Sequence, residues 1–206
     1  DHQARAIGTL LRQQGPVGER ALLLYDSGLD YMAAFFGCLY AGWIAVPSYP
    51  PRLNRADSRL AAMIDDARAR VVLATAKIHE QIDRYAKYTP AIENLQLLST
   101  EDAGDPQHWQ PPEIEPDDLA FLQYTSGSTS TPKGVMVSHG NLLSNFRMIA
   151  AAFDQDDTSL LASWLPLFHD MGLIVFALPT LYLGAQCILM PPVVFLQEPF
   201  RWLHAI

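Results

Sequence analysis

QYTSGSTSTPKGV, at residues 123–135, is the stretch from which the rest of the sequence is best interpreted. Apolar residues predict a buried strand over 119–125 that leads into it. Seven small or hydroxylated residues then occupy positions 125–131, followed by Pro132, Lys133 and Gly134. Small side chains let the backbone approach an anion, and hydroxyl and N–H groups donate to phosphate oxygens. The stretch therefore predicts a phosphate-binding loop in which Lys133 supplies a positive charge.

Two other interpretations of this loop have to be compared with phosphate binding. Runs of serine, threonine and glycine are also common in plain polar connections, so a hairpin linker stays open. The phosphate loop of P-loop nucleotidases requires glycine, lysine and then serine or threonine after four intervening residues. This chain has Pro132, Lys133 and Gly134 there, and no strong helix begins directly afterwards. The spacing therefore disfavours a P-loop nucleotidase.

Outward from this loop, short apolar segments alternate with amphipathic ones along the whole chain. Strands are predicted at 20–25, 43–46, 71–74, 95–98, 119–125, 134–137, 160–164 and 187–190. Helices are predicted at 4–14, 29–41, 54–69, 77–88, 139–153 and 171–183, and from 198 onward. Gly42 is expected to end the second helix and Pro47 to stop the strand after it. This alternation predicts an α/β fold with mostly parallel β-sheets flanked by helices.

Residues 100–118 interrupt the pattern with four prolines among acidic residues. We interpret this segment as a surface connection inside one domain, with a domain linker as the alternative. A length of 206 residues suits about one domain. The chain begins at Asp1 without methionine and ends inside an amphipathic segment, so we expect a piece of a larger protein. No signal peptide opens it, and we expect a cytoplasmic location.

Composition excludes several classes of function. The formal net charge is −8, with 14 basic against 22 acidic residues and no basic cluster. Nucleic acid is therefore not an expected partner, although a single loop can still bind a nucleotide. No apolar stretch reaches the ~18 residues that span a bilayer, so no transmembrane segment is expected. Cys38 and Cys187 lie in apolar runs and are interpreted as buried, inert thiols, and no metal-ligand spacing occurs.

Four segments together resemble the adenylate-forming superfamily, which includes acyl-CoA synthetases, non-ribosomal peptide adenylation domains and luciferases. Residues 123–135 are similar to its phosphate-binding signature. SWLPLFHDMGL at 163–173 is similar to its second core motif. Residues 31–51, which contain YAGWIAVP, are similar to the helix and strand that open the fold, and VSHGNL at 137–142 is similar to the sequence after the loop. The resemblance covers nearly the whole chain. It implies a truncated N-terminal subdomain of the acyl-adenylate-forming fold.

Ser130 narrows the resemblance, because most members of the superfamily carry glycine at this position. With LQY before the loop and PSYPP at 47–51, it is typical of the fatty acyl-AMP ligases. These enzymes convert a fatty acid and ATP to acyl-AMP and pyrophosphate, then pass the acyl group to an acyl carrier protein, usually for polyketide or lipopeptide synthesis. An acyl-CoA synthetase, with CoA as acceptor, is the nearest alternative. A non-catalytic docking module of a megasynthase is a second one.

The resemblance also implies roles for individual residues. The loop residues expected to contact the triphosphate of ATP are Thr125, Ser126, Gly127, Ser128, Thr129, Lys133 and Gly134. Mg²⁺ would bridge the phosphate oxygens. Lys133 and His169 are the expected catalytic residues, His169 lying where the acyl and nucleotide pockets meet and positioning the carboxylate. No residue of this chain is expected to bind a metal ion directly.

Other positions receive structural interpretations. Adjacent side chains rarely face one another, so His169 and Asp170 are not expected to form a dyad, and Asp170 is interpreted as structural. Gly172 is expected to permit close packing. Asp66 is placed on a solvated helix face. The ribose-binding acidic residue, a Tyr-Gly-x-Ser/Thr-Glu segment and the late catalytic lysine of the family are absent from these 206 residues. The C-terminal domain is therefore expected to be absent and the chain to be inactive by itself.

Overall fold

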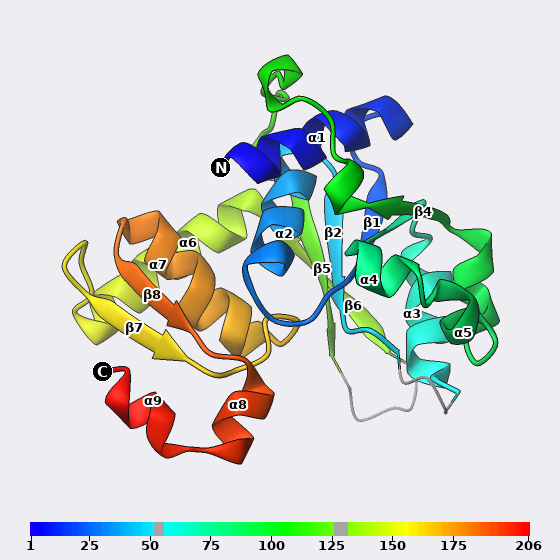
Figure 1. The fold of residues 1–206 in the computed structure, drawn as a ribbon. Helices are drawn as coiled ribbons and strands as arrows, with labels where there is room; N and C mark the ends of the chain where they lie inside the picture. The colour runs from blue at the N-terminus through cyan, green and yellow to red at the C-terminus, as the bar shows by residue number, and fades with distance from the viewer. Residues whose placement is uncertain (52–55, 126–131) are drawn as a thin grey trace.

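A six-stranded sheet with the order β4-β3-β1-β2-β5-β6 forms the centre of the computed structural model, which describes residues 1–51, 56–125 and 132–206 (Figure 1). The strands are β1 (Arg20–Leu24), β2 (Ile44–Ser48), β3 (Val71–Ala74), β4 (Gln96–Ser99), β5 (Leu119–Thr125) and β6 (Lys133–Ser138). The first five run parallel, and β6 runs antiparallel to β5. The predicted α/β class with a mostly parallel sheet is confirmed.

Helices cover both faces of this sheet, because its strands carry apolar side chains on both sides. One face packs against α1 (His2–Gln14) and α2 (Leu29–Ala41), and Leu23 of β1 belongs to this cluster. The other face packs against α3 (Ser58–Ala67), α4 (Ala76–His79) and α5 (Ile82–Ala86), and here Leu22 contributes. Successive strand residues point to opposite faces, so both neighbours are fully buried.

The rest of the chain forms a smaller unit beside the main sheet (Figure 1). It contains a two-stranded parallel sheet, β7 (Leu160–Ser163) with β8 (Gln186–Leu189). Its helices are α6 (His139–Phe153), the π-helix η4 (Met171–Ala177), α7 (Leu178–Leu183), α8 (Pro192–Gln197) and α9 (Phe200–His204). A capping box between Ser138 and Asn141 begins α6 at the predicted residue.

The prediction that Pro47 stops its strand is wrong, because β2 continues to Ser48. The N–H of Ile44 donates to Glu19 on the β1 side, so strand alternation directs the nitrogen of Pro47 toward β5. The registered pairing of β2 with β5 consists of Ala45 and Phe121, two residues before Pro47. The missing N–H of Pro47 therefore lies where that pairing has already ended.

Several helices also differ from their predicted bounds. Residues 77–88 form the two short helices α4 and α5 instead of one. The predicted helix 171–183 changes from π to α geometry at Leu178, next to Pro179, which has no N–H to donate to the carbonyl of Val175. Helix α3 begins at Ser58, and residues 54–55 of the prediction lie outside the described residues. Helix α8 was not predicted.

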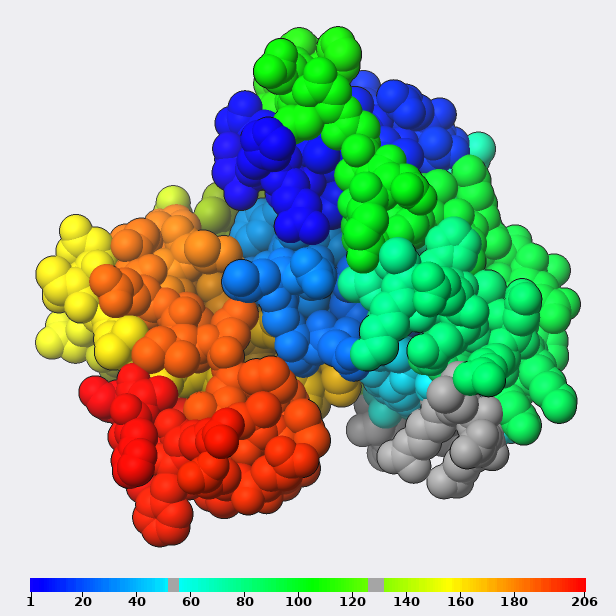
Figure 2. All heavy atoms as spheres, in the orientation of Figure 1, coloured from blue at the N-terminus to red at the C-terminus, as the bar shows by residue number. Residues whose placement is uncertain are grey.

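The proline-rich segment 100–118 lies on the surface against α1 (Figure 2). It contains two short 3₁₀ turns, η2 (Thr100–Asp102) and η3 (Pro106–His108), and another, η1 (Pro90–Asn94), precedes β4. Trp109 fastens the segment to the domain, because its indole N–H donates to the carbonyl of Tyr40 at 2.8 Å. The guanidinium of Arg5 lies 4.8 Å from the centre of the same ring.

Candidate active site at the carboxyl ends of the strands

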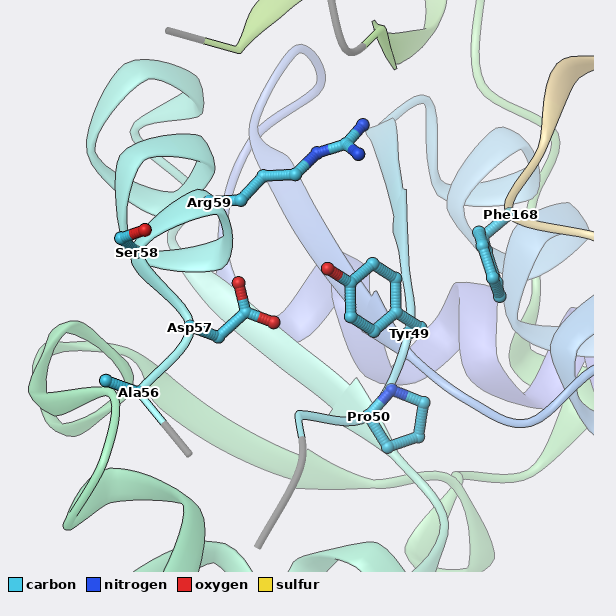
Figure 3. Close-up of a pocket in the computed structure, with 7 residues that line it drawn as sticks. All are labelled: Tyr49, Pro50, Ala56, Asp57, Ser58, Arg59 and Phe168. Atoms are coloured by element: carbon cyan, nitrogen blue, oxygen red, sulfur yellow. The ribbon is translucent and has the colours of Figure 1, made fainter. Parts of the chain in front are cut away.

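The candidate site begins where the parallel strands end. Ligands of open α/β sheets bind at the carboxyl edge of the strands. At this edge a cavity of about 470 Å³ opens beside the end of β2 (Figure 3). Its lining residues come from three places along the chain, after β2, at the start of α3 and after β7, and are Tyr49, Pro50, Ala56, Asp57, Ser58, Arg59 and Phe168.

The two ends of the predicted phosphate loop lie side by side at the same edge. Thr125 at the end of β5 pairs with Lys133 at the start of β6, and Tyr124 pairs with Gly134. Thr125 and Lys133 are both exposed. The remaining predicted phosphate contacts, Ser126, Gly127, Ser128 and Thr129, lie outside the described residues. The structure therefore places the first and last members of the predicted set together.

Tyr124 is the next-to-last residue of β5, and two hydrogen bonds connect it to helix α3. Its ring is 5% exposed, and its hydroxyl donates to Asp66 Oδ2 at 2.5 Å. Its carbonyl accepts from Arg59 Nη2 at 3.4 Å. Burial, with the Asp66 carboxylate beside it, raises the pKa of Tyr124. Asp66 lies on an exposed face of α3, as predicted, and its carboxylate also accepts this hydrogen bond from a residue 58 positions away, which the sequence did not indicate.

Gly134 packs directly against that same tyrosine ring. A Cβ atom at Gly134 would lie 2.9 Å from Cζ and 3.0 Å from the hydroxyl oxygen of Tyr124. The sequence interpretation gave Gly134 a phosphate contact alone, whereas the structure adds a packing reason for glycine. The ring cannot move away without breaking its hydrogen bond to Asp66.

Gly134→Ala is expected to lower the free energy of unfolding by about 1–2 kcal/mol, because the added methyl group overpacks a buried ring. Denaturant titration measures this change. The matched control is Gly104→Ala, whose Cβ would meet Thr9 at an ordinary 3.5 Å and should leave stability nearly unchanged. Equal stabilities of the two variants would contradict the packing role of Gly134.

The loop that carries His169 is held by hydrogen bonds to β5 and to the segment that follows β1. Gln123 Nε2 of β5 donates to the carbonyl of Phe168 at 3.2 Å. The backbone N–H of Leu167 donates to Ser27 Oγ, in the segment after β1, at 3.0 Å. Sequence reasoning missed Gln123 and Ser27 as positioning residues. The amide of Gln123 within an otherwise apolar buried strand was the available signal.

His169 and Asp170 contact each other, which the sequence analysis did not expect. His169 Nδ1 lies 2.5 Å from Asp170 Oδ1, and both side chains are more than half exposed. The same carboxylate oxygen accepts from the N–H of Met171 at 2.7 Å, where the following helix begins. Asp170 already has helical backbone angles, so the two side chains project from one turn rather than from opposite sides of an extended chain.

Neither the two cysteines nor the potential metal ligands of the described residues form a second centre. Cys38 is buried, and burial raises the pKa of its thiol, whereas Cys187 is half-buried instead of fully buried. Within residues 1–51, 56–125 and 132–206, no group of three or more His, Cys, Asp and Glu side chains is arranged to hold a metal ion. In the same ranges, no helix is both long and apolar enough to cross a bilayer.

The model of the AMP-binding enzyme family matches residues 1–206. The chain is 42% identical over its whole length to a medium-chain-fatty-acid–[acyl-carrier-protein] ligase of Moorena producens. It is 37% identical over 94% of its length to a long-chain-fatty-acid–AMP ligase of Mycobacterium tuberculosis. The chain spans 36% and 35% of these two relatives.

Among solved structures, the chain matches a fatty acyl-adenylate ligase from L. pneumophila, crystallised in complex with acyl adenylate and pyrophosphate. The TM-score is 0.89 at 42% identity, with 100% of this chain and 36% of that one covered. Adenylation domains of non-ribosomal peptide synthetases share the fold, with a TM-score of 0.87 at 24% identity in one case. The chain therefore belongs to the AMP-binding enzyme family.

Proposed function

We propose that this chain is the N-terminal part of a fatty acyl-AMP ligase, which joins a fatty acid to ATP and forms acyl-AMP and pyrophosphate. One observation carries the proposal. The ends of the phosphate loop at Thr125 and Lys133 and the His169 loop are connected through a single strand, β5, by its pairing to β6 and by the Gln123–Phe168 hydrogen bond. The similarity to fatty acyl-AMP ligases over the whole chain supports this choice of substrates.

In this reaction the fatty acid carboxylate attacks the α-phosphorus of ATP, and pyrophosphate leaves. The substrate supplies the nucleophile, so the protein has to align the reactants and stabilise phosphate charge. We propose that the loop does this through the residues Thr125, Ser126, Gly127, Ser128, Thr129, Lys133 and Gly134. Mg²⁺ held by the phosphates would reduce their negative charge. Thr125 is exposed at this edge, and its hydroxyl is an oxygen ligand of the type that Mg²⁺ prefers.

His169 is proposed to position the fatty acid carboxylate. Its Nδ1 is occupied by Asp170, so its Nε2 is the ring nitrogen left to face the reactants. The backbone of its loop is fixed at Leu167 and Phe168. This anchoring supports a positioning role, because a carboxylate can be aligned only by a group whose own backbone is held.

The further steps belong to the whole protein. We propose that an acyl carrier protein accepts the acyl group, as the name of the relative from Moorena producens indicates for that protein. Supply of acyl chains to polyketide or lipopeptide synthesis is part of the same proposal, and so is a C-terminal domain beyond this partial AMP-binding domain. Because ATP is the co-substrate, we place the reaction in the cytoplasm.

The test uses the natural chain extended to its full C-terminus. The protein is incubated with ATP, Mg²⁺, dodecanoate and CoA, and the products are identified by mass spectrometry. We expect acyl-AMP to accumulate without acyl-CoA. The 206-residue chain serves as a parallel sample and is expected to form no acyl-AMP, because the family's later catalytic residues are missing from it.

Each alternative gives a different result in this assay. Acyl-CoA among the products would identify an acyl-CoA synthetase instead. Neither product with any of several fatty acids, together with no binding of ATP, would favour a non-catalytic docking module. Robust acyl-AMP formation by the 206-residue chain alone would contradict the proposal that a C-terminal domain is required.

A further inference from the structure

Arg59 is a cation at the candidate site that lies outside every motif of the sequence. It is the second residue of α3, and its side chain extends across the cavity that Tyr49 and Phe168 also line (Figure 3). Its guanidinium reaches β5, where Nη2 donates to the carbonyl of Tyr124. That carbonyl is one residue before Thr125, the first residue of the predicted phosphate loop.

Local structure does not account for an arginine at this position. The positive end of the helix dipole disfavours a cation in the first turn of a helix. The nearby carboxylate of Asp57 is engaged in capping α3, since it accepts from the N–H of Leu60 at 2.9 Å. Among the described residues Arg59 forms no ion pair, and its hydrogen bond to Tyr124 is long at 3.4 Å. Within residues 1–51, 56–125 and 132–206, most of its hydrogen-bonding capacity is therefore unused and can serve a ligand.

Arg59 and Lys133 approach the loop from different elements. Lys133 opens β6 and pairs with Thr125, whereas Arg59 comes from α3 and contacts the neighbouring Tyr124. Lys133 and Arg59 thus contact adjacent residues of β5, one by strand pairing and the other by a side-chain hydrogen bond, although they are 74 positions apart in the chain. An anion bound between the loop ends would meet Lys133 as a point charge and Arg59 as a planar fork of donors.

We propose that Arg59 binds the β- and γ-phosphates of ATP and the pyrophosphate formed from them. This proposal rests on the proposed function and adds a residue to its phosphate site. When the bond between the α-phosphorus and its bridging oxygen breaks, the electron pair leaves with pyrophosphate. The permanently protonated guanidinium stabilises that growing negative charge.

The test measures equilibrium binding by the full-length protein, with inorganic pyrophosphate, ATP and AMP as probes in the presence of Mg²⁺. Arg59→Gln is expected to weaken binding of pyrophosphate and ATP by about 10- to 100-fold, the usual effect of removing a charged hydrogen-bond donor. AMP lacks the β- and γ-phosphates, so its affinity should not change. Arg59→Lys should fall between the two because it keeps the charge and loses the fork.

The matched control is Arg84→Gln, which removes an exposed arginine of α5 outside the cavity. It should leave all three affinities unchanged. If Arg59→Gln binds pyrophosphate as tightly as Arg84→Gln does, the proposal is overturned. Equal losses for AMP and ATP would also overturn it, because they would show a purely structural role through Tyr124. Failure of the unmutated protein to bind ATP or pyrophosphate would instead overturn the proposed function.

Discussion

Replacing Gly172 with alanine is expected to lower the free energy of unfolding by about 3 kcal/mol and to abolish acyl-AMP formation by the full-length protein. A Cβ atom at Gly172 would lie 2.2 Å from the carbonyl oxygen of Pro166 and 3.1 Å from that of Leu165. Both are backbone atoms, which cannot rotate away as a side chain can. The clash therefore has to displace either η4 or the turn before it.

Displacement of that turn reaches the proposed catalytic residue. The carbonyl of Pro166 accepts a hydrogen bond from the N–H of His169 at 3.1 Å, and the carbonyl of His169 accepts from Leu173 of η4. The atom that the new methyl group meets is thus part of the turn that holds His169. A small shift of a positioning group is enough to lose much of the rate.

Denaturant titration measures the stability effect, and mass spectrometry of the products measures the loss of adenylation. Gly28→Ala is the matched control, because its backbone is extended, with φ at 167°, and no atom lies within 4 Å of its added Cβ. Gly28 is the N-cap of α2, where alanine is less favourable than glycine, so this control should cost up to about 1 kcal/mol, well below the loss at Gly172. A Gly172→Ala protein as stable as the Gly28→Ala protein would show that the contact with Pro166 does not constrain the loop.

Lys133→Ala in the full-length protein is expected to reduce kcat for acyl-AMP formation by about 100- to 1,000-fold, while dodecanoate binds with unchanged affinity. Lys133 is exposed at the start of β6, opposite Thr125, where its ammonium group can reach a phosphate. Its loss removes charge stabilisation from the phosphates and nothing from the acyl chain.

The measurement pairs steady-state pyrophosphate release with equilibrium binding of dodecanoate. Lys87→Ala provides the control, since this lysine is exposed at the end of α5 and its ammonium group lies a distant 5.9 Å from the centre of the Tyr88 ring. It should leave both quantities unchanged. If Lys133→Ala weakened dodecanoate binding as much as it slowed pyrophosphate release, the assignment of Lys133 to the phosphates would be wrong.

The parts of the fold that follow from local pattern could be predicted from sequence. The bounds of α2, β3, β5 and α6 agree with the predicted ranges, because each has a clear periodicity and a defined end, such as Gly42 in the left-handed conformation at φ 70°. The phosphate loop was placed after a buried strand, and its described ends lie there.

The errors arose where neighbours in space override local preference. Pro47 remains inside β2 because its missing donor faces a side where pairing has ended, and no residue near it in sequence reveals this. The exposed position of Asp66 was predicted, but the hydrogen bond that it accepts from Tyr124 was not, because the two residues are 58 positions apart in the chain. His169 and Asp170 face each other because Asp170, the residue before η4, already has helical backbone angles.

The sequence by itself determined the order of strands and helices, the location of the loop and the family, because these depend on residue type and spacing along the chain. Only the tertiary structure decided how the site is held together. Its connections join Leu167 to Ser27 across 140 positions, Phe168 to Gln123 across 45 and Tyr124 to Asp66 across 58. Such contacts leave no periodic trace in the sequence, because each depends on which elements the fold brings together at the carboxyl edge of the sheet.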